Sequence, residues 1–164
     1  MDAITMDLTS WPTRVKQAFP AITFELGNDF RWSPQHQTVY IGRITDKRDV
    51  ITLLHEIGHA MADHSGYDRD IALLALEREA WTIASTHVAP LFDLTIDDEL
   101  IEEALDSYRD WLHARSTCPE CSQNGVQKDA RTYECLLCHT SWRVNDARRC
   151  GLKRYRLTTT KHPL

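Results

Sequence analysis

The sequence predicts an α+β protein in which a small antiparallel sheet packs on helices, followed by a compact four-cysteine module. Three observations predict this class. Short runs rich in β-branched and aromatic residues lie between residues 21 and 42. Apolar residues then recur at helical spacing over three longer segments, and two Cys-x-x-Cys pairs follow.

The N-terminal elements are bounded by proline and glycine. Ser10-Trp11-Pro12 predicts a helix start, and Pro20 ends that helix after Phe19. Three strands are predicted at 21–26, 30–32 and 37–42. The third strand is a candidate sheet edge to which an extended peptide adds, and a central core strand is the equal alternative.

Three helices are predicted next, at 46–64, 69–89 and 95–114. The first has an apolar stripe formed by Val50, Leu53, Leu54, Ile57 and Met61. Ser65-Gly66 ends it, and Pro90 ends the second helix. Acidic residues at 97–99 suit the positive N-terminus of the third helix.

The composition is that of a folded, water-soluble protein. Apolar residues make up 42% of the 164 residues and charged residues 26%, which excludes a disordered chain. No run reaches the roughly 20 apolar residues of a membrane span, and the acidic start resembles no secretory signal. Cysteines in Cys-x-x-Cys pairs favour metal binding in a reducing compartment. We therefore expect a cytoplasmic protein without a membrane partner.

The charge divides unevenly along the chain. Residues 1–114 carry 9 Lys and Arg against 20 Asp and Glu, whereas residues 115–164 carry 10 against 4. The change of sign coincides with the start of the cysteine module. We expect one domain over 1–114 and a zinc ribbon with a basic tail over 115–164.

The run His55-Glu56-Ile57-Gly58-His59 is the most informative motif. Residues four apart on a helix lie on one face, so both imidazoles can bind a single zinc ion. Glu56, next to the first histidine, suits a general base acting on a metal-activated water. The motif predicts a catalytic zinc site with His55 and His59 as ligands.

A catalytic zinc ion takes a third protein ligand and keeps one position for water. The candidates are His64, Glu77, Glu79 and His87. His64 falls at the frayed end of the motif helix, where we expect an exposed histidine near the negative helix end. Glu77 shares a helix face with Leu73 and Trp81, so spacing does not exclude it, but we expect a solvated acid there.

Glu79 aligns with the apolar positions Ala72, Ala75 and Ile83, a stripe expected to face the motif helix. The pairing of the motif with Glu79-Ala80-x-x-x-Ala84 and a later proline resembles the ImmA/IrrE family of small zinc metallopeptidases. The resemblance covers about residues 10–92. It implies that Glu79 is the third ligand and Glu56 the base. Trp81 departs from the family pattern, as does the added cysteine module, and both leave the substrate open.

The resemblance implies a zinc-dependent endopeptidase that hydrolyses a specific protein substrate. In such an enzyme zinc polarises the scissile carbonyl, and Glu56 takes a proton from the attacking water and passes it to the leaving amine.

The second motif is Cys118-x-x-Cys121 with Cys135-x-x-Cys138. Four thiolates at this spacing predict a structural zinc ion that orders a chain segment too short for its own core. We expect Tyr133, Leu136 and Trp142 to supply its few packing contacts. His139 is not an expected ligand, and Cys150 is expected to be a free thiol.

The basic residues behind the ribbon predict a nucleic-acid surface as one alternative, with three aromatic residues stacking on bases. These are Tyr133, Trp142 and Tyr155. A solvated tail is the other alternative. The ribbon and tail also resemble the arrangement of SprT-like proteases, which act on DNA-bound proteins and use a later histidine as third ligand. A non-catalytic adaptor that binds a partner through the ribbon is the remaining alternative.

Overall fold

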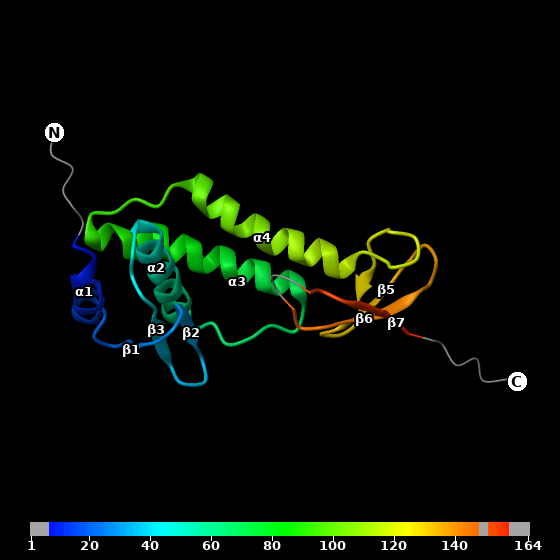
Figure 1. The fold of residues 1–164 in the computed structure, drawn as a ribbon, viewed down its shortest axis with the longest axis horizontal. Helices are drawn as coiled ribbons and strands as arrows, with labels where there is room; N and C mark the ends of the chain where they lie inside the picture. The colour runs from blue at the N-terminus through cyan, green and yellow to red at the C-terminus, as the bar shows by residue number, and fades with distance from the viewer. Residues whose placement is uncertain (1–6, 148–150, 158–164) are drawn as a thin grey trace, which may run out of the picture. The chain divides into compact units, whose positions relative to one another are not determined.

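A computed structural model describes residues 7–147 and 151–157 and confirms the α+β class (Figure 1). Its helices are α1 (Trp11–Ala18), α2 (Lys47–Met61), α3 (Asp70–Ile83) and α4 (Asp98–Ser116). Its strands are β1 (Thr23–Leu26), β2 (Arg31–Ser33), β3 (Thr38–Ile41), β4 (Val126–Gln127), β5 (Thr132–Glu134), β6 (Ser141–Val144) and β7 (Arg154–Arg156). A short 3-10 turn, Leu8–Ser10, precedes α1. The helix predicted to reach residue 89 instead changes after α3 to a π-helical turn, Ala84–Val88, and a 3-10 turn, Ala89–Phe92.

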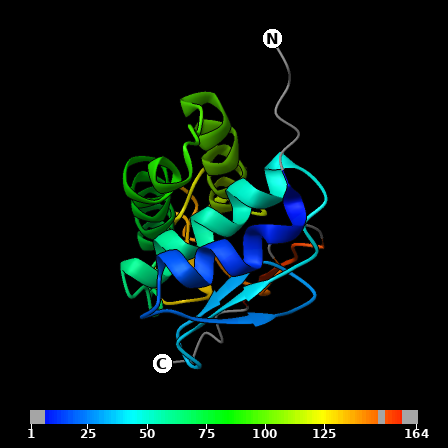
Figure 2. The same ribbon diagram turned by 90° about the vertical axis from the view of Figure 1, so that its left-hand side faces the viewer.

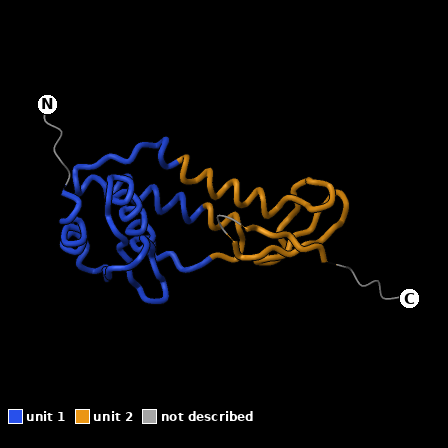
Figure 3. Tube along the Cα trace, viewed as in Figure 1, with its two compact units in different colours: residues 1–66, 75–101 blue, residues 67–74, 102–164 orange. Residues whose placement is uncertain are grey.

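The chain divides into two compact units (Figure 3). The first combines residues 1–66 with 75–101, and the second combines 67–74 with 102–164. The boundary predicted near residue 115 falls inside the second unit. The division into domains of residues 1–114 and 115–164 therefore stays a prediction.

The sheet of the first unit has the strand order β1-β3-β2 and is mixed, which corrects the antiparallel sheet expected from the sequence. β2 and β3 form an antiparallel hairpin, but β1 pairs with β3 in parallel. The chain after β1 crosses the end of β3, where a side chain at Gly42 would lie 3.1 Å from the backbone carbon of Asp29. Because this crossing carries β2 to the far side of β3, β3 is central and β2 forms one edge.

The helices α1 and α2 lie over one face of this sheet (Figure 2). The largest side chains of this core include Trp11, Val15, Val39, Leu53 and Leu54, all fully buried. The predicted apolar stripe of α2 is buried as expected except at its last member, because Met61 is exposed. This packing holds α2 rigidly against the sheet.

The helix α2 has well-defined ends. The Asp46 carboxylate accepts a hydrogen bond from the Asp49 N–H at 3.0 Å, and the Asp49 carboxylate accepts one from the Asp46 N–H at 3.3 Å, a capping box. The helix ends at Met61, three residues earlier than predicted. Asp63, in the left-handed region with φ of 50°, then reverses the chain.

The second unit contains the four-stranded sheet β4-β5-β6-β7 with antiparallel neighbours. A small buried cluster at this sheet consists of Cys118, Tyr133, Cys135, Trp142 and Val144. Tyr133 and Trp142 pack there as predicted, with their rings stacked 5.6 Å apart. Leu136 does not contribute, because it points to solvent at the tip of the second Cys-x-x-Cys turn.

Beside this cluster lies a buried ion pair, in which Arg115 Nε donates to Asp70 Oδ2 at 2.7 Å. The Tyr133 hydroxyl also donates to this carboxylate. The same guanidinium donates to the carbonyls of Asn145 and Ala130. The start of α3, the end of α4 and the ribbon thus share one polar network within the second unit.

Among the described helices, none has the length and apolar content of a membrane span.

Candidate metal centres

The helix α2 places the two motif histidines one above the other on its buried side. The Nε2 atoms of His55 and His59 lie 3.1 Å apart, and the rings meet edge to face. This is the arrangement that four-residue spacing on a helix predicts.

Glu77 of α3 completes a three-residue group. Its Oε2 lies 3.0 Å from His55 Nε2 and 3.4 Å from His59 Nε2. Around a tetrahedral ion with bonds of about 2.0–2.1 Å, ligand atoms lie about 3.3–3.4 Å apart. The three observed separations are close to that value, so these side chains fit one metal ion.

The ligand set implied by the family resemblance is corrected at its third member. Glu79 points away from the two Nε2 atoms; its side chain is 60% exposed, whereas the Glu77 side chain is 6% exposed. Two residues along a helix differ by about 200° around its axis, so Glu77 and Glu79 cannot face the same partner. Because Glu77 replaces Glu79, a histidine–histidine–glutamate group is retained.

Glu79 was expected as the third ligand because the wrong apolar face of α3 was expected to meet α2. Ala75 is exposed, and Ala72 and Ile83 are only partly buried. The buried stripe consists instead of Leu73, Glu77, Ala80, Trp81 and Ala84. These residues recur every three or four positions, which is a sequence signal that Glu77 lies on a buried helix face. Ala72, Ala75 and Ile83 recur at a similar spacing on another face, so spacing alone did not distinguish the two faces.

Close packing of α2 and α3 brings Glu77 within reach of the histidines. A side-chain carbon added at Gly58 would lie 2.3 Å from the Ala80 carbonyl oxygen, so only glycine allows this approach. Trp81 then stacks on His55, with ring centroids 4.1 Å apart and planes inclined by 20°. The tryptophan that departs from the family pattern therefore forms one wall of the site.

Burial and ion pairing shift the ionisation of these groups in opposite directions. Burial lowers the pKa of His55, which favours the neutral imidazole that a metal ion requires. Burial also opposes ionisation of Glu77, but its interactions with the imidazoles of His55 and His59 outweigh it and lower the pKa of this carboxyl to about 2. A charged carboxylate and neutral imidazoles are the ligand forms that bind metal.

Glu56 lies beside this group and is held by the edge strand β2. Its Oε2 accepts a hydrogen bond of 2.7 Å from the Trp32 backbone N–H. Burial raises the pKa of Glu56 to about 7, although His59 and the Trp32 N–H favour its charged form. A carboxyl group in this range can both accept and release a proton near neutral pH.

His64 differs from the exposed helix-end residue that we expected. It is buried, and its Nδ1 lies 2.8 Å from His59 Nδ1. The reversal at Asp63 folds it back under the end of α2. His64 contacts the Nδ1 atom of His59 and lies away from the group formed by the two Nε2 atoms and Glu77. His64 therefore does not occupy the third-ligand position of a SprT-like site. His87, the remaining candidate, is exposed and pairs with the Thr86 hydroxyl.

The four predicted ribbon cysteines come together in the second unit. Cys118 Sγ and Cys138 Sγ lie 3.6 Å apart, and Cys121 Sγ and Cys135 Sγ lie 3.5 Å apart. These separations exceed the roughly 2.05 Å of a disulfide and approach the roughly 3.8 Å between thiolates around a tetrahedral ion with 2.3 Å bonds. All four sulfur atoms lie within 4.8 Å of one another, so this group also fits a metal ion.

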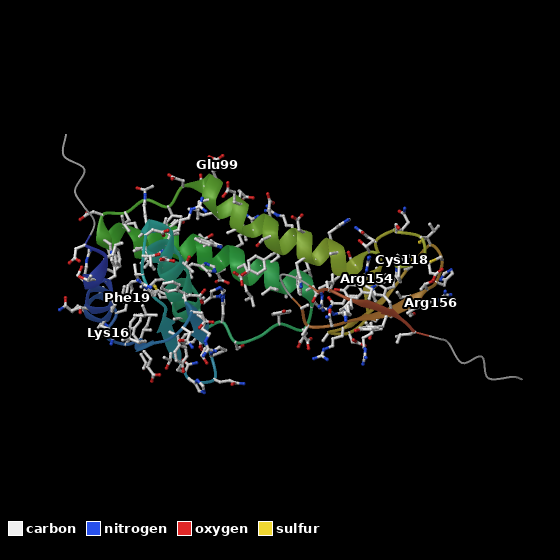
Figure 4. All side chains as sticks on the ribbon, in the orientation of Figure 1. Lys16, Phe19, Glu99, Cys118, Arg154 and Arg156 are labelled. Carbon is white, nitrogen blue, oxygen red and sulfur yellow. The ribbon has the colours of Figure 1, made fainter. Side chains whose placement is uncertain are left out.

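The basic surface predicted for the ribbon is only partly available. Arg156 Nη1 pairs with Glu120 at 2.5 Å, and Arg154 donates to the Thr117 carbonyl, both beside Cys118 (Figure 4). Of the three aromatic residues expected to stack on bases, Tyr133 and Trp142 are buried and only Tyr155 is exposed. Base stacking by the first two is therefore excluded. Arg148, Arg149 and Lys161, which belong to the predicted basic surface, and the predicted free thiol of Cys150 lie outside the described residues.

Comparison with known proteins found no matching family model, no matching curated protein and no matching solved structure.

Proposed function

We propose that the chain is a zinc-dependent endopeptidase in which His55, His59 and Glu77 hold the catalytic zinc ion and Glu56 is the general base. The observation that carries this proposal is the convergence of two imidazole nitrogens and one carboxylate oxygen next to a second, separately held carboxyl group. The family resemblance of the motif supports it from the sequence. A second zinc ion in the four-cysteine group would have a structural role.

His55, His59 and Glu77 would hold the zinc ion, which when bound would supply a Lewis acid for a carbonyl oxygen and lower the pKa of a water molecule to about 7. Glu56 takes the proton of the attacking water and returns it to the leaving amine. The Trp32 N–H fixes the orientation of the Glu56 carboxylate before substrate binds. Trp81 excludes water from the His55 side of the site through its stacked ring.

The substrate is an extended segment of a protein. β3 is central, so the edge of the sheet that reaches Glu56 is β2. A peptide that adds to the outer edge of β2 as a further strand would pass the Glu56 carboxylate. This placement replaces the one considered from the sequence, in which 38–42 formed the edge.

A comparison of the zinc-loaded wild type with Glu56→Gln tests the proposal. Both proteins are incubated with a peptide library made from a whole-cell protein digest, and new N-termini are identified by mass spectrometry. We expect a defined set of new termini with the wild type and at least a 100-fold lower yield with Glu56→Gln. Equal yields from the two proteins would exclude Glu56 as the base.

The SprT-like and adaptor alternatives make different predictions for the same material. A SprT-like protease requires DNA for full activity and loses that stimulation at high salt. An adaptor binds metal through the cysteines alone and gives no new termini. The buried Glu77 against both imidazoles favours the peptidase over the adaptor.

A further inference from the structure

We propose that His64 and Glu79 are positioning residues that hold His59 in the orientation and tautomer required for metal binding. This inference rests on the proposed metal site of His55, His59 and Glu77, and it assigns a role to two of the three candidate ligands that this site leaves out.

The three side chains form a continuous chain of contacts that ends at the metal group. Glu79 Oε2 lies 3.2 Å from His64 Nε2, and His64 Nδ1 lies 2.8 Å from His59 Nδ1. His59 Nε2, on the other side of the ring, lies 3.1 Å from His55 Nε2. The imidazoles of His59 and His64 therefore each use both nitrogens.

With an ionised Glu79 and a neutral His64, the hydrogen-bonding capacity of these groups allows one arrangement of protons. An ionised carboxylate only accepts, so the Nε2 of a neutral His64 donates to Glu79. The Nδ1 of that imidazole is then an acceptor, so His59 must donate from Nδ1. The lone pair of His59 is thereby assigned to Nε2, which faces His55 and Glu77. This is the tautomer that a metal ligand at Nε2 requires.

The fold holds His64 in this position from three sides. The backbone N–H of His64 donates to the His59 carbonyl at 3.1 Å, which ties the reversed segment to the end of α2. Its carbonyl accepts a hydrogen bond of 2.8 Å from the Trp32 indole N–H. The preceding residue, Asp63, accepts one from Gln37 at 3.3 Å. A buried ring that is fixed by its own backbone is suited to orienting a neighbour.

The two histidine ligands are oriented by different means. His55 Nδ1 is buried and has no hydrogen-bond partner among the described residues, and its ring is held by stacking on Trp81. His59 is less enclosed, with its side chain 12% exposed, and no tryptophan stacks on it among the described residues. The polar chain through His64 thus supplies for His59 the restraint that Trp81 supplies for His55.

The test measures metal affinity and does not depend on a substrate. Zinc affinity of the full chain is determined by competition with a chelator. A parallel titration with Co²⁺ distinguishes the sites, because thiolate ligands give a charge-transfer band that nitrogen and oxygen ligands lack. We expect His64→Ala to weaken binding at the histidine site by about 10–100-fold and to leave the thiolate site unchanged.

Two substitutions separate positioning from general disruption. His64→Asn places an oxygen where His64 Nδ1 lies and can still accept from His59, so we expect it to restore part of the affinity lost in His64→Ala. Glu79→Ala should weaken binding less than His64→Ala, and the double variant should be no weaker than His64→Ala alone, since both act through one chain. Matched controls are His87→Ala and Glu25→Gln, two exposed residues in the same unit that lie outside the metal group.

Other results would overturn the proposal. If His64→Ala binds zinc as tightly as His87→Ala, His64 does not position His59. If His64→Ala and His64→Asn both lose the metal as completely as Glu77→Ala, His64 is itself a ligand. A wild type that binds only the thiolate-held metal would overturn this inference together with the metal site. Absence of peptidase activity in a protein that binds both metals would overturn the proposed function alone.

Discussion

Gly58 lies so close to Ala80 that a side-chain carbon at residue 58 would stand 2.3 Å from the Ala80 carbonyl oxygen. The obstruction is backbone, which cannot rotate away as the end of a side chain can. The glycine inside the motif therefore sets the separation of α2 and α3. That separation in turn lets a glutamate on one helix reach two histidines on the other.

We expect Gly58→Ala to destabilise the protein by about 1–3 kcal/mol and to weaken metal binding at the histidine site, because the two helices must move apart. Urea unfolding and metal analysis of the same preparation measure the two effects. Gly66→Ala is the control, since no atom lies within 4 Å of a side-chain carbon added there. Its stability should stay within about 0.5 kcal/mol of wild type. Equal changes in stability and metal binding for the two variants would show that α2 and α3 can accommodate a side chain at residue 58.

Glu77→Gln should reduce the bound metal from about two ions per chain to about one, because an amide is a poor substitute for a carboxylate ligand. Glu79→Gln should keep both ions, since its side chain lies outside the metal group and an amide oxygen can still accept a hydrogen bond from His64. Elemental analysis after dialysis against a weak chelator measures the difference. The opposite result, with metal lost from the Glu79 variant only, would restore the assignment implied by the family resemblance.

Arg115→Met should cost about 3–5 kcal/mol of stability, because it leaves the buried Asp70 carboxylate without its charged partner. Two backbone carbonyls also lose their donor. The control is Arg109→Met on the same helix, where the ion pairs with Asp106 and Glu102 are exposed. Such pairs contribute about 0–1 kcal/mol. Urea unfolding of the metal-loaded proteins compares the two variants. Similar losses of stability in both would contradict a buried ion pair between Arg115 and Asp70.

The pH dependence of stability should report the burial of Glu56. Burial raises its pKa from 4.5 to about 7 in the folded, metal-free protein, so folding is opposed once the carboxyl must ionise. Below pH 4.5 it is protonated in both states and contributes nothing. As the pH rises to about 7 the folded state loses stability, by about 3 kcal/mol from this group.

Glu56→Gln removes this titration, so the advantage of the variant over wild type should grow by that amount between pH 4.5 and about 7.5. Glu77 titrates in both proteins and cancels in the difference. The measurement is urea unfolding of metal-free protein across this pH range. A difference that stays constant with pH would place the Glu56 carboxyl in contact with water.

Much of this protein could be predicted from local patterns. The spacing of His55 and His59 places their rings on one helix face whatever the rest of the chain does. The Cys-x-x-Cys pairs likewise bring their thiolates together within one short turn each. The α+β class followed from the succession of strand-like and helical periods, because those periods report which residues face a core.

The third member of the histidine group depended on packing. Glu77 and Glu79 both lie on faces of α3 that carry apolar residues, and a one-dimensional pattern does not say which face meets α2. The contact between Gly58 and Ala80 decides it. The position of β3 within its sheet was also decided by packing, since the crossing after β1 depends on room at Gly42.

The amino-acid sequence by itself determined the ligand pairs that lie three or four residues apart. These are His55 with His59 on a helix and the two cysteines of each Cys-x-x-Cys turn, because helix and turn geometry is local. Only the tertiary structure decided that Glu77 joins His55 and His59, that Glu79 reaches them through His64, and that β2 meets Glu56. Those relationships join separate segments of the chain, and burial of apolar surface, which sets how such segments pack, is non-directional and does not appear in local spacing.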